Sequence, residues 1–257
     1  NLLTLILGWD GLGLVSFLLV IYYQNKSSLS GGLLTFLSNR FGDSALIVSV
    51  GLILIDSSYD LFYIHMSGYV KLLFFFIMVC ALTKSAQLPF SAWLPAAMAA
   101  PTPVSSLVHS STLVTAGVYL LFRVLMFNLA DGLINILYYI SIATMILAST
   151  SALLEMDFKK IIALSTLSQL SVMMFILSLG LPELCFFHML THAMFKALMF
   201  LSAGSVMHSL FGSQDMRFKG GAYLCSPLVS LSMGVSLMSL SGMPFLSGFY
   251  SKDLILE

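Results

Sequence analysis

The sequence predicts an all-α polytopic membrane protein with about eight transmembrane crossings, two of which are broken helices. Its 257 residues are 59% hydrophobic and only 9% charged, whereas about a quarter of the residues in an ordinary soluble domain are charged. The apolar runs also reach the length of roughly 18 or more residues that crosses a hydrocarbon core. A chain of this composition cannot cover itself with a polar surface, so lipid is its expected solvent.

Short polar or Gly/Pro-rich segments divide the chain into its expected crossings. These cover residues 1–23, 32–55, 71–99, 103–126, 133–154, 160–179, 183–210 and, with a break, 228–241 and 250–257. The third crossing is interrupted by Pro89 and Pro95, because proline removes a helical hydrogen bond and clashes with the preceding turn. The Pro-Thr-Pro at 101–103 then forces a turn and favours Pro103 as a first helical residue.

The eighth crossing is also expected to be a broken helix. Its break falls between Gly242 and Gly248, around Pro244. A lysine accompanies each break: Lys84 in the third crossing and Lys252 in the eighth. Interrupted segments in corresponding positions indicate a transporter built from repeated units, with ordinary proline kinks as the alternative interpretation.

Charged residues in the expected loops divide unevenly between two faces. One face carries the basic residues Lys26, Lys159, Lys160, Arg217 and Lys219. The other carries mostly the acidic residues Asp56, Asp60, Asp131 and Glu183, although Lys71 falls among them. By the positive-inside rule, the basic face is expected to lie in the cytoplasm or the mitochondrial matrix.

Composition also excludes several classes of function. The formal net charge is zero, so nothing indicates a nucleic-acid partner or an acidic substrate. The sequence has no phosphate-binding glycine loop and no close metal-ligand spacing, so no cofactor or metal is expected on this chain. The cysteines Cys80, Cys185 and Cys225 are interpreted as small buried hydrophobic residues. Both ends read as cuts in a longer protein.

Ionisable residues inside the apolar runs are the main functional signal. They are Asp10, Arg40, Asp43, Lys84, His109, His188, His192, Lys196 and Lys252. Each Lys, Arg or Asp costs roughly 2.5–3.5 kcal/mol at a helix centre on insertion scales, so these groups must face one another or a hydrated interior. An ion path, most simply for protons, is the default functional hypothesis.

The charged residues of the first three crossings are expected to pair. Arg40 and Asp43 are three residues apart on one helix and can neutralise each other, as a pair no more functional than structural. Lys84 and Asp10 have no opposite charge within a turn, so the simplest hypothesis joins them across two helices. A buried lysine beside a carboxylate can change protonation when that carboxylate is displaced or neutralised.

Histidines define a second candidate group. His188, His192 and Lys196 recur every fourth residue, which aligns them along one face of a helix. A stripe of titratable groups suits a proton relay, whereas a single buried His is more often a satisfied core residue. Zinc binding by the two histidines lacks a third ligand nearby in sequence. His109 lies among Ser and Thr residues whose hydroxyls can hold ordered water.

Several motifs resemble those of one family. They are Gly-Trp-Asp-Gly-Leu-Gly at 8–13, Asn-Arg-Phe-Gly-Asp at 39–43, Lys-Ser-Ala-Gln-Leu-Pro at 84–89, Pro-Thr-Pro-Val-Ser-Ser-Leu-Val-His at 101–109, Asp-Phe-Lys-Lys at 157–160, His-Ala-Met-Phe-Lys-Ala at 192–197 and Gly-Phe-Tyr-Ser-Lys-Asp at 248–253. Across essentially the whole chain they resemble the NADH dehydrogenase subunit 5 family, the distal antiporter-like subunits of respiratory complex I. The large subunits of multisubunit sodium/proton antiporters share the fold and several of these motifs. The Met- and Phe-rich composition is similar to that of animal mitochondrial members, and Asp10 to that of arthropod ones.

The resemblance implies one transmembrane antiporter-like domain over 1–257, with parts of two inverted repeats at about 1–127 and 128–257. In such subunits the carboxylate at Asp10 pairs with Lys84, Lys196 is the central lysine, and Lys252 leads to the exit side. His109, His188 and His192 are taken to carry or organise the water wire. The supporting residues are Arg40, Asp43, Pro89, Pro244 and Asp253. Most relatives have Glu at the position of Asp10, and the shorter side chain weakens the expected Asp10–Lys84 contact.

The function implied by the resemblance is proton translocation as a subunit of NADH:ubiquinone oxidoreductase in the mitochondrial inner membrane, with the basic loops in the matrix. The chain itself would perform no redox chemistry, and NADH, FMN, iron–sulfur clusters and ubiquinone would belong to the parent complex. Its expected partners are lipid, water, protons and the neighbouring antiporter-like subunit of the membrane arm. Two alternatives stay open: a sodium/proton antiporter subunit, and a membrane scaffold whose buried charges are only structural pairs.

Overall fold

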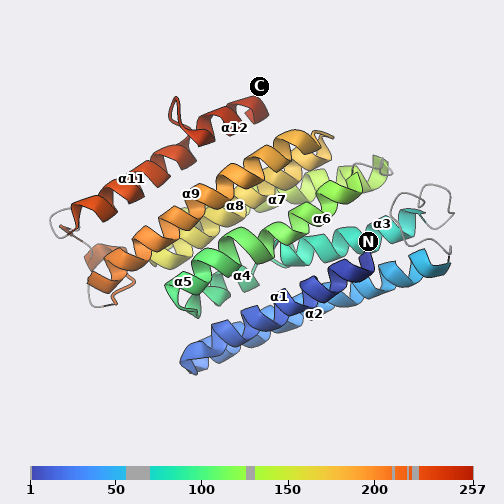
Figure 1. The fold of residues 1–257 in the computed structure, drawn as a ribbon, viewed down its shortest axis with the longest axis horizontal. Coiled ribbons are helices and arrows are strands. Elements are labelled where there is room, and N and C mark those ends of the chain that lie inside the picture. Colours follow the sequence, from blue (N-terminus) through green and yellow to red (C-terminus); the bar gives the residue numbers. More distant parts are fainter. Residues whose placement is uncertain are drawn as a thin grey trace.

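The structure, a computed structural model, describes residues 2–55, 70–125, 131–209, 212–218, 220–221 and 226–256. Within these residues it consists of helices and turns, without a strand. The elements are α1 (Leu2–Val20), η1 (Ile21–Tyr23), α2 (Lys26–Ile55), α3 (Val70–Lys84), α4 (Trp93–Ala96), η3 (Ala97–Ala99), α5 (Thr102–Val104), η4 (Ser105–Thr112), α6 (Leu113–Leu125), α7 (Asp131–Leu154), α8 (Phe158–Ser178), α9 (Pro182–Ser209), η5 (Met216–Phe218), α11 (Pro227–Ser241) and α12 (Ser247–Leu256). The long helices run alongside one another, with α1 and α2 at one edge and α11 and α12 at the other (Figure 1).

Helix length and surface composition both fit a membrane. Six helical segments of the described chain are long and apolar enough to cross one: Leu2–Tyr23, Lys26–Leu54, Thr102–Val124, Gly132–Leu154, Phe158–Ser178 and Pro182–Ser209. Large apolar side chains face outward, among them Leu7 at 79% and Leu153 at 83% exposure, and such a surface requires lipid or protein against it. The predicted all-α membrane fold is confirmed. The count of eight crossings stays a prediction, because α3 and α11 have only 15 residues each.

The second helix begins earlier than the sequence predicts. We expected it from residue 32, but α2 starts at Lys26 and includes the polar Lys-Ser-Ser segment. Ser28 explains this start, because its hydroxyl accepts a hydrogen bond of 2.9 Å from the Asn25 backbone N–H and donates one of 2.8 Å to the Asn25 carbonyl. A side chain that satisfies the free groups at a helix start extends the helix toward it.

The first helix break begins at Lys84, the last residue of α3, five residues before Pro89. At this ending the carbonyl of Thr83 accepts a hydrogen bond of 2.9 Å from the Trp93 indole N–H and one of 3.3 Å from the Ala86 backbone N–H. Ala86 then adopts a positive φ of 55°, which turns the chain. The predicted break is therefore present, and it places the Lys84 side chain at a helix end rather than in mid-helix.

A buried glutamine secures this break to α7. Gln87 donates from Nε2 to the Ser85 carbonyl at 3.3 Å, four residues before Pro89, which has no backbone N–H to offer it. Its Oε1 accepts a hydrogen bond of 2.5 Å from the Thr144 hydroxyl on α7. Because an unpaired backbone carbonyl is costly inside a membrane, Gln87 makes the irregular segment tolerable there.

A π-helix follows the short helix α5. Helix α5 begins at Thr102, one residue before the predicted Pro103, and passes into the eight-residue π-helix η4, where the sequence predicts ordinary α-helix. Within η4 the Thr112 hydroxyl donates to the Leu107 carbonyl at 3.0 Å. Hydroxyls that bond carbonyls of the preceding turn compete with the regular helical ladder, and η4 packs against α9.

Lys159 corrects one loop assignment. We expected it in a loop, but α8 begins at Phe158, and Lys159 lies buried in the first turn. Its Nζ donates a hydrogen bond of 3.1 Å to the Ala100 carbonyl, in the bend between η3 and α5. Lys160 is only partly buried and pairs with Asp157 at 3.0 Å. The two adjacent lysines therefore differ in burial and in partner, because Lys159 reaches the Ala100 carbonyl whereas Lys160 reaches the Asp157 carboxylate.

The second helix break separates α11 from α12. Gly242 ends α11 with a positive φ of 84°, and α12 starts at Ser247, three residues before the predicted continuation at Tyr250. Gly248 makes the close approach of the two segments possible, since a Cβ there would lie 1.7 Å from the carbonyl oxygen of Ser239. The predicted break around Pro244 is present.

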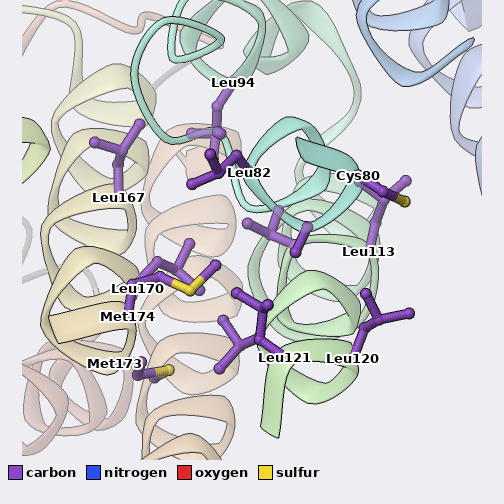
Figure 2. Packing of buried hydrophobic residues seen from close by; sticks show 14 of the residues in the cluster. Cys80, Leu82, Leu94, Leu113, Leu120, Leu121, Leu167, Leu170, Met173 and Met174 are labelled. Carbon is purple, nitrogen blue, oxygen red and sulfur yellow. The ribbon is translucent and has the colours of Figure 1, made fainter. Parts of the chain in front are cut away.

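Buried apolar side chains form a core between the helices in the middle of the bundle. Leu82 of α3, Leu94 of α4, Leu121 of α6 and Leu167 and Leu170 of α8 belong to one cluster of buried apolar side chains (Figure 2). Cys80 and Cys185 are buried, as predicted; Cys225 lies outside the described residues. The same cluster includes buried residues of α2, α3 and α9, so it connects the helices that carry Asp43, Lys84 and Lys196.

Candidate functional site

Lys84 lies in a buried group at the end of α3. Its side chain is 2% exposed, and its Nζ lies 3.8 Å from Oδ1 of Asp43 on α2. The same ammonium donates to the Trp9 carbonyl at 3.4 Å and sits 5.0 Å from the centroid of the Trp9 ring on α1. Three helices therefore converge on one charged nitrogen, which a carboxylate, a carbonyl and an aromatic face all stabilise.

Asp10 does not meet Lys84, so the predicted direct pair is wrong in this structure. Instead Asp10 Oδ1 lies 3.2 Å from Nη1 of Arg40, and the same guanidinium nitrogen lies 3.5 Å from Oδ2 of Asp43. The long Arg40 side chain bridges the two carboxylates, whereas the short Asp10 side chain stays near the outer side at 40% exposure. Asp10, Arg40, Asp43 and Lys84 form a neutral chain of alternating charges, which we call the lysine–carboxylate cluster.

Lys196 is a completely buried lysine of α9. It has no exposed surface, and its Nζ donates a hydrogen bond of 2.7 Å to the Ser165 hydroxyl of α8. None of the ion pairs in the described part of the chain includes Lys196. An ammonium held by a neutral hydroxyl alone is a costly arrangement in an apolar interior, which makes the site a strong candidate for changes of protonation.

The histidines lie where the spacing predicts. His188 and His192 are fully buried on α9 with Lys196, and their ring centroids are 6.3 Å apart. His188 is hydrogen-bonded on both sides, to Gln169 of α8 at 3.1 Å and to Ser251 of α12 at 3.0 Å. The ring nitrogens of His192 have no partner among the described protein atoms. The three side chains form one buried group, which we call the histidine stripe.

Lys252 joins this group from the second break. It lies on α12 and donates a hydrogen bond to the Leu240 carbonyl, which the end of α11 leaves free. It directly follows Ser251, which bonds His188, on the helix that packs against α9. Asp253 follows it on α12 and is partly buried. The structure thus brings four predicted residues together around α9.

His109 belongs to the π-helix η4, and its side chain lies outside the described residues. Its backbone is in the helical segment that packs against α9. The neighbouring Ser105 and Ser106 hydroxyls donate to the carbonyls of Thr102 and Pro103, each at 2.8 Å. These hydroxyls are therefore satisfied within their own helix.

A polar cavity opens at the end of the bundle that carries the basic residues. Its volume is about 730 Å³, and its lining includes Ser27, Lys159, Lys160, His208 and Gln214. Backbone hydrogen bonds also join the segments before α8 and after α9 there, Phe158 N–H to Gln214 at 3.0 Å and Met216 N–H to Met156 at 3.1 Å.

The structure therefore gathers most of the predicted basic face at one end. In that face the Asp215 carboxylate, hydrogen-bonded to the Arg217 guanidinium, raises the pKa of Arg217. The predicted loop residues Lys219, Asp56 and Asp60, and the side chain of Asp131, lie outside the described residues.

Several site residues escaped the sequence analysis. Ser165 and Gln169 of α8 bind Lys196 and His188, and Ser251 of α12 completes the His188 contacts. Ser165 and Gln169 are four residues apart, so their spacing alone would place them on one face of α8. This spacing is the sequence feature from which the pair could have been predicted. Among the described residues no three His, Cys, Asp or Glu side chains gather as a metal site.

The fold and the site define a polytopic membrane protein with ionisable groups buried near broken helices, an arrangement typical of membrane transporters. A family model described as NADH:quinone oxidoreductase/Mrp antiporter, transmembrane, matches residues 1–257. The chain belongs to this family.

Two curated relatives that are similar to the whole chain share one name. NADH-ubiquinone oxidoreductase chain 5 of Locusta migratoria is 55% identical over 261 residues, which cover 100% of this chain and 46% of that protein. The protein of the same name from Anopheles arabiensis is 55% identical over 266 residues, covering 100% of this chain and 68% of that protein. The chain thus spans about half the length of the locust relative.

Solved structures agree on the fold. A chain in the structure of the Mrp complex from Dietzia sp. DQ12-45-1b superposes with a TM-score of 0.91 at 29% identity, covering 99% of this chain and 29% of that chain. A chain of the membrane-bound sulfane sulfur reductase, an archaeal respiratory membrane complex, gives a TM-score of 0.90 at 24% identity, covering 100% of this chain and 55% of that chain. The second likeness shows the fold alone.

Proposed function

We propose that the protein is part of a proton-translocating membrane subunit of NADH:ubiquinone oxidoreductase, respiratory complex I. The observation that carries this proposal is Lys196, a fully buried ammonium held by one hydroxyl beside two buried histidines. A buried lysine is costly to keep charged and costly to leave unpaired. The presence of such a lysine inside a membrane protein is best explained by gain and loss of a proton during turnover.

In the proposed mechanism the lysine–carboxylate cluster receives the driving signal. A charge that approaches from a neighbouring subunit redistributes the Asp10–Arg40–Asp43 contacts, which changes how strongly Asp43 holds Lys84. The released proton then passes to Lys196 and on to Lys252 through ordered water along the histidine stripe, whose histidines organise this water. The carboxylate nearest Lys84 in this scheme is Asp43, a residue that the sequence suggests only as a supporting one.

Location, partners and cofactors follow from the same proposal. We place the protein in the mitochondrial inner membrane with the basic face in the matrix. Its partner is the adjacent antiporter-like subunit of the membrane arm, and the two breaks at α3 and α11–α12 belong to two inverted repeats, at about 1–127 and 128–257. NADH, FMN, iron–sulfur clusters and ubiquinone belong to other subunits, so this chain performs no redox step.

Sodium/proton antiport is the second candidate, favoured by the likeness to a chain of the Mrp complex. Sodium, a hard cation, would require several oxygen ligands, carboxylates among them, within reach of the path. Asp10 and Asp43 already face Arg40 and Lys84, which favours protons as the cargo. Transport that depends on sodium and continues without NADH oxidation would decide for this alternative.

The test measures protons moved per NADH oxidised in vesicles containing the complete complex. Lys84→Ala and Lys196→Ala should each lower this ratio while the complex still assembles. Lys71→Ala is the matched control, because Lys71 is an exposed lysine at the start of α3. Unchanged ratios in both buried-lysine variants would reject the proposed function.

A further inference from the structure

His188 is held by three helices at once, and one of its partners is an amide. Its Nε2 lies 3.1 Å from Oε1 of Gln169 on α8, and its Nδ1 lies 3.0 Å from the Ser251 hydroxyl on α12. His188 and Ser251 are 0% and 1% exposed, and Gln169 is 7% exposed. Bulk water therefore does not compete for either ring nitrogen.

These contacts determine where the imidazole carries its proton. A glutamine Oε1 can only accept, so the hydrogen of a neutral ring must sit on Nε2. The lone pair on Nδ1 then accepts the single Ser251 hydroxyl hydrogen, because Nδ1 lies 3.0 Å from the Ser251 oxygen whereas the competing Ser247 and Gly248 carbonyls each lie 3.3 Å from it. The partner of one ring nitrogen sets the role of the other. Gln169 therefore makes Nε2 the donor and Nδ1 the acceptor.

We propose that Gln169 is a positioning residue of the proton path, which fixes the Nε2–H tautomer of His188 and closes the path on the α8 side. The inference rests on the proposed function and adds a residue to it. His188 then exchanges protons only through Ser251, toward α12.

The step can be followed proton by proton. A proton that reaches the Ser251 oxygen displaces the hydroxyl proton onto Nδ1, so the hydroxyl is restored and His188 becomes an imidazolium. Its second N–H still points to Gln169, whose amide oxygen is too weak a base to take a proton. The charge can therefore leave only by the reverse transfer to Ser251, unless the His188–Gln169 hydrogen bond breaks.

Neighbouring groups place this exchange beside α12. The Thr191 hydroxyl of α9 lies 3.5 Å from the Ser251 hydroxyl and also donates to the His188 carbonyl at 3.1 Å. Ser251 immediately precedes Lys252, which bonds the Leu240 carbonyl across the second break. A shift of α12 would therefore change the His188 and Lys252 contacts together.

The test compares Gln169→Met with Gln169→Glu in the complete complex. Methionine keeps the volume but accepts no comparable hydrogen bond, whereas glutamate keeps the acceptor oxygen. Thr166→Val is the matched control, because Thr166 is a buried α8 residue whose hydroxyl, within the described part of the chain, bonds only the Ala163 carbonyl of its own helix. Infrared spectra of isotope-labelled histidine report the tautomer, and subtraction of the His188→Gln spectrum isolates the His188 signal.

For Gln169→Met we expect the tautomer ratio of His188 to shift by about five-fold toward the Nδ1–H form, the effect of one lost hydrogen bond. The protons moved per NADH oxidised should fall as well. Gln169→Glu should retain the Nε2–H signal, and Thr166→Val should match the parent in both measurements.

A Gln169→Met complex with the parent tautomer, or with a shifted tautomer and an unchanged proton ratio, would overturn the inference. Lys196→Ala separates this result from the proposed function. If Lys196→Ala lowers the ratio and Gln169→Met does not, only the role of Gln169 is rejected. If Lys84→Ala and Lys196→Ala both leave the ratio unchanged, the proposed function fails, and the role of Gln169 fails with it.

Discussion

Oδ1 of Asp43 lies 3.8 Å from the ammonium nitrogen of Lys84, and both side chains are almost completely buried, at 7% and 2% exposure. The other Asp43 oxygen faces Arg40, which in turn reaches Asp10. Asp43 is thus the carboxylate that stands between the two cations. Any change in its charge is felt by both Lys84 and Arg40, whereas a change at Asp10 is felt first by Arg40.

This arrangement predicts that Asp43→Asn is more harmful than Asp10→Asn. Removal of one partner of a buried ion pair costs about 3–5 kcal/mol, because the other charge stays buried, whereas a partly exposed pair contributes about 1 kcal/mol or less. Asp43→Asn should lower both the amount of assembled complex and the protons moved per NADH oxidised. Native gels and vesicle acidification measure the two quantities, and an equal or larger loss in Asp10→Asn would contradict the arrangement.

The Ser165–Lys196 hydrogen bond predicts a functional role for a hydroxyl on α8. Ser165→Ala removes the partner of a fully buried ammonium, and a hydrogen bond to a charged group is worth about 1.5–3 kcal/mol. We expect proton translocation to fall about ten-fold or more, with partial rescue in Ser165→Thr. Ser168→Ala serves as the control, because the Ser168 hydroxyl bonds only the Ser165 carbonyl of its own helix among the residues that the structure describes. Equal rates in Ser165→Ala and Ser168→Ala would show that the hydroxyl is dispensable.

The adjacent lysines at the start of α8 predict a contrast in stability. Lys159→Met leaves the Ala100 carbonyl without its donor in the bend before α5, which should cost about 1–3 kcal/mol. Lys160→Met removes a partly exposed pair with Asp157 and should cost about 1 kcal/mol or less. Thermal inactivation of the assembled complex compares the two. A Lys160→Met complex that inactivates at the lower temperature would contradict the burial of Lys159.

Sequence alone predicted the helices and one of the two buried groups. Apolar runs near 20 residues and the prolines located the crossings and both breaks, because lipid leaves a chain few alternatives to helix. His188, His192 and Lys196 were predicted to share a face, because their spacing of four follows directly from helical geometry. Such features depend on one helix at a time.

Features that depend on two helices were not predictable. Whether Asp10 or Asp43 faces Lys84 depends on how α1 and α2 rotate about their axes, and both faces of these helices are apolar enough to allow either choice. Lys159 was assigned to a loop because its free carbonyl partner, Ala100, is 59 residues away. The π-helix η4 was missed because a Ser- and Thr-rich helix start has no distinct periodicity of its own.

The close packing at the second break predicts that replacement of Gly248 by alanine is harmful, whereas the same replacement of Gly234 is not. A Cβ at Gly248 would lie 1.7 Å from the carbonyl oxygen of Ser239, which is backbone and cannot rotate away, whereas a Cβ at Gly234 of α11 would meet nothing within 4 Å. Gly248→Ala should therefore push α12 off α11 and cost more than the 1–3 kcal/mol typical of overpacking. Gly234→Ala should be neutral or slightly stabilising, because alanine is the better helix former.

The same displacement has a functional consequence, since Ser251 and Lys252 lie one turn beyond Gly248. In a Gly248→Ala complex that still assembles, the His188 partner on α12 and the Lys252–Leu240 contact should be lost together, and proton translocation should fall while NADH oxidation by the other subunits continues. Cysteine cross-linking between α11 and α12 measures the packing, and vesicle acidification measures the transport. Parent-like cross-linking and transport in Gly248→Ala would show that the two segments do not approach as closely as the structure places them.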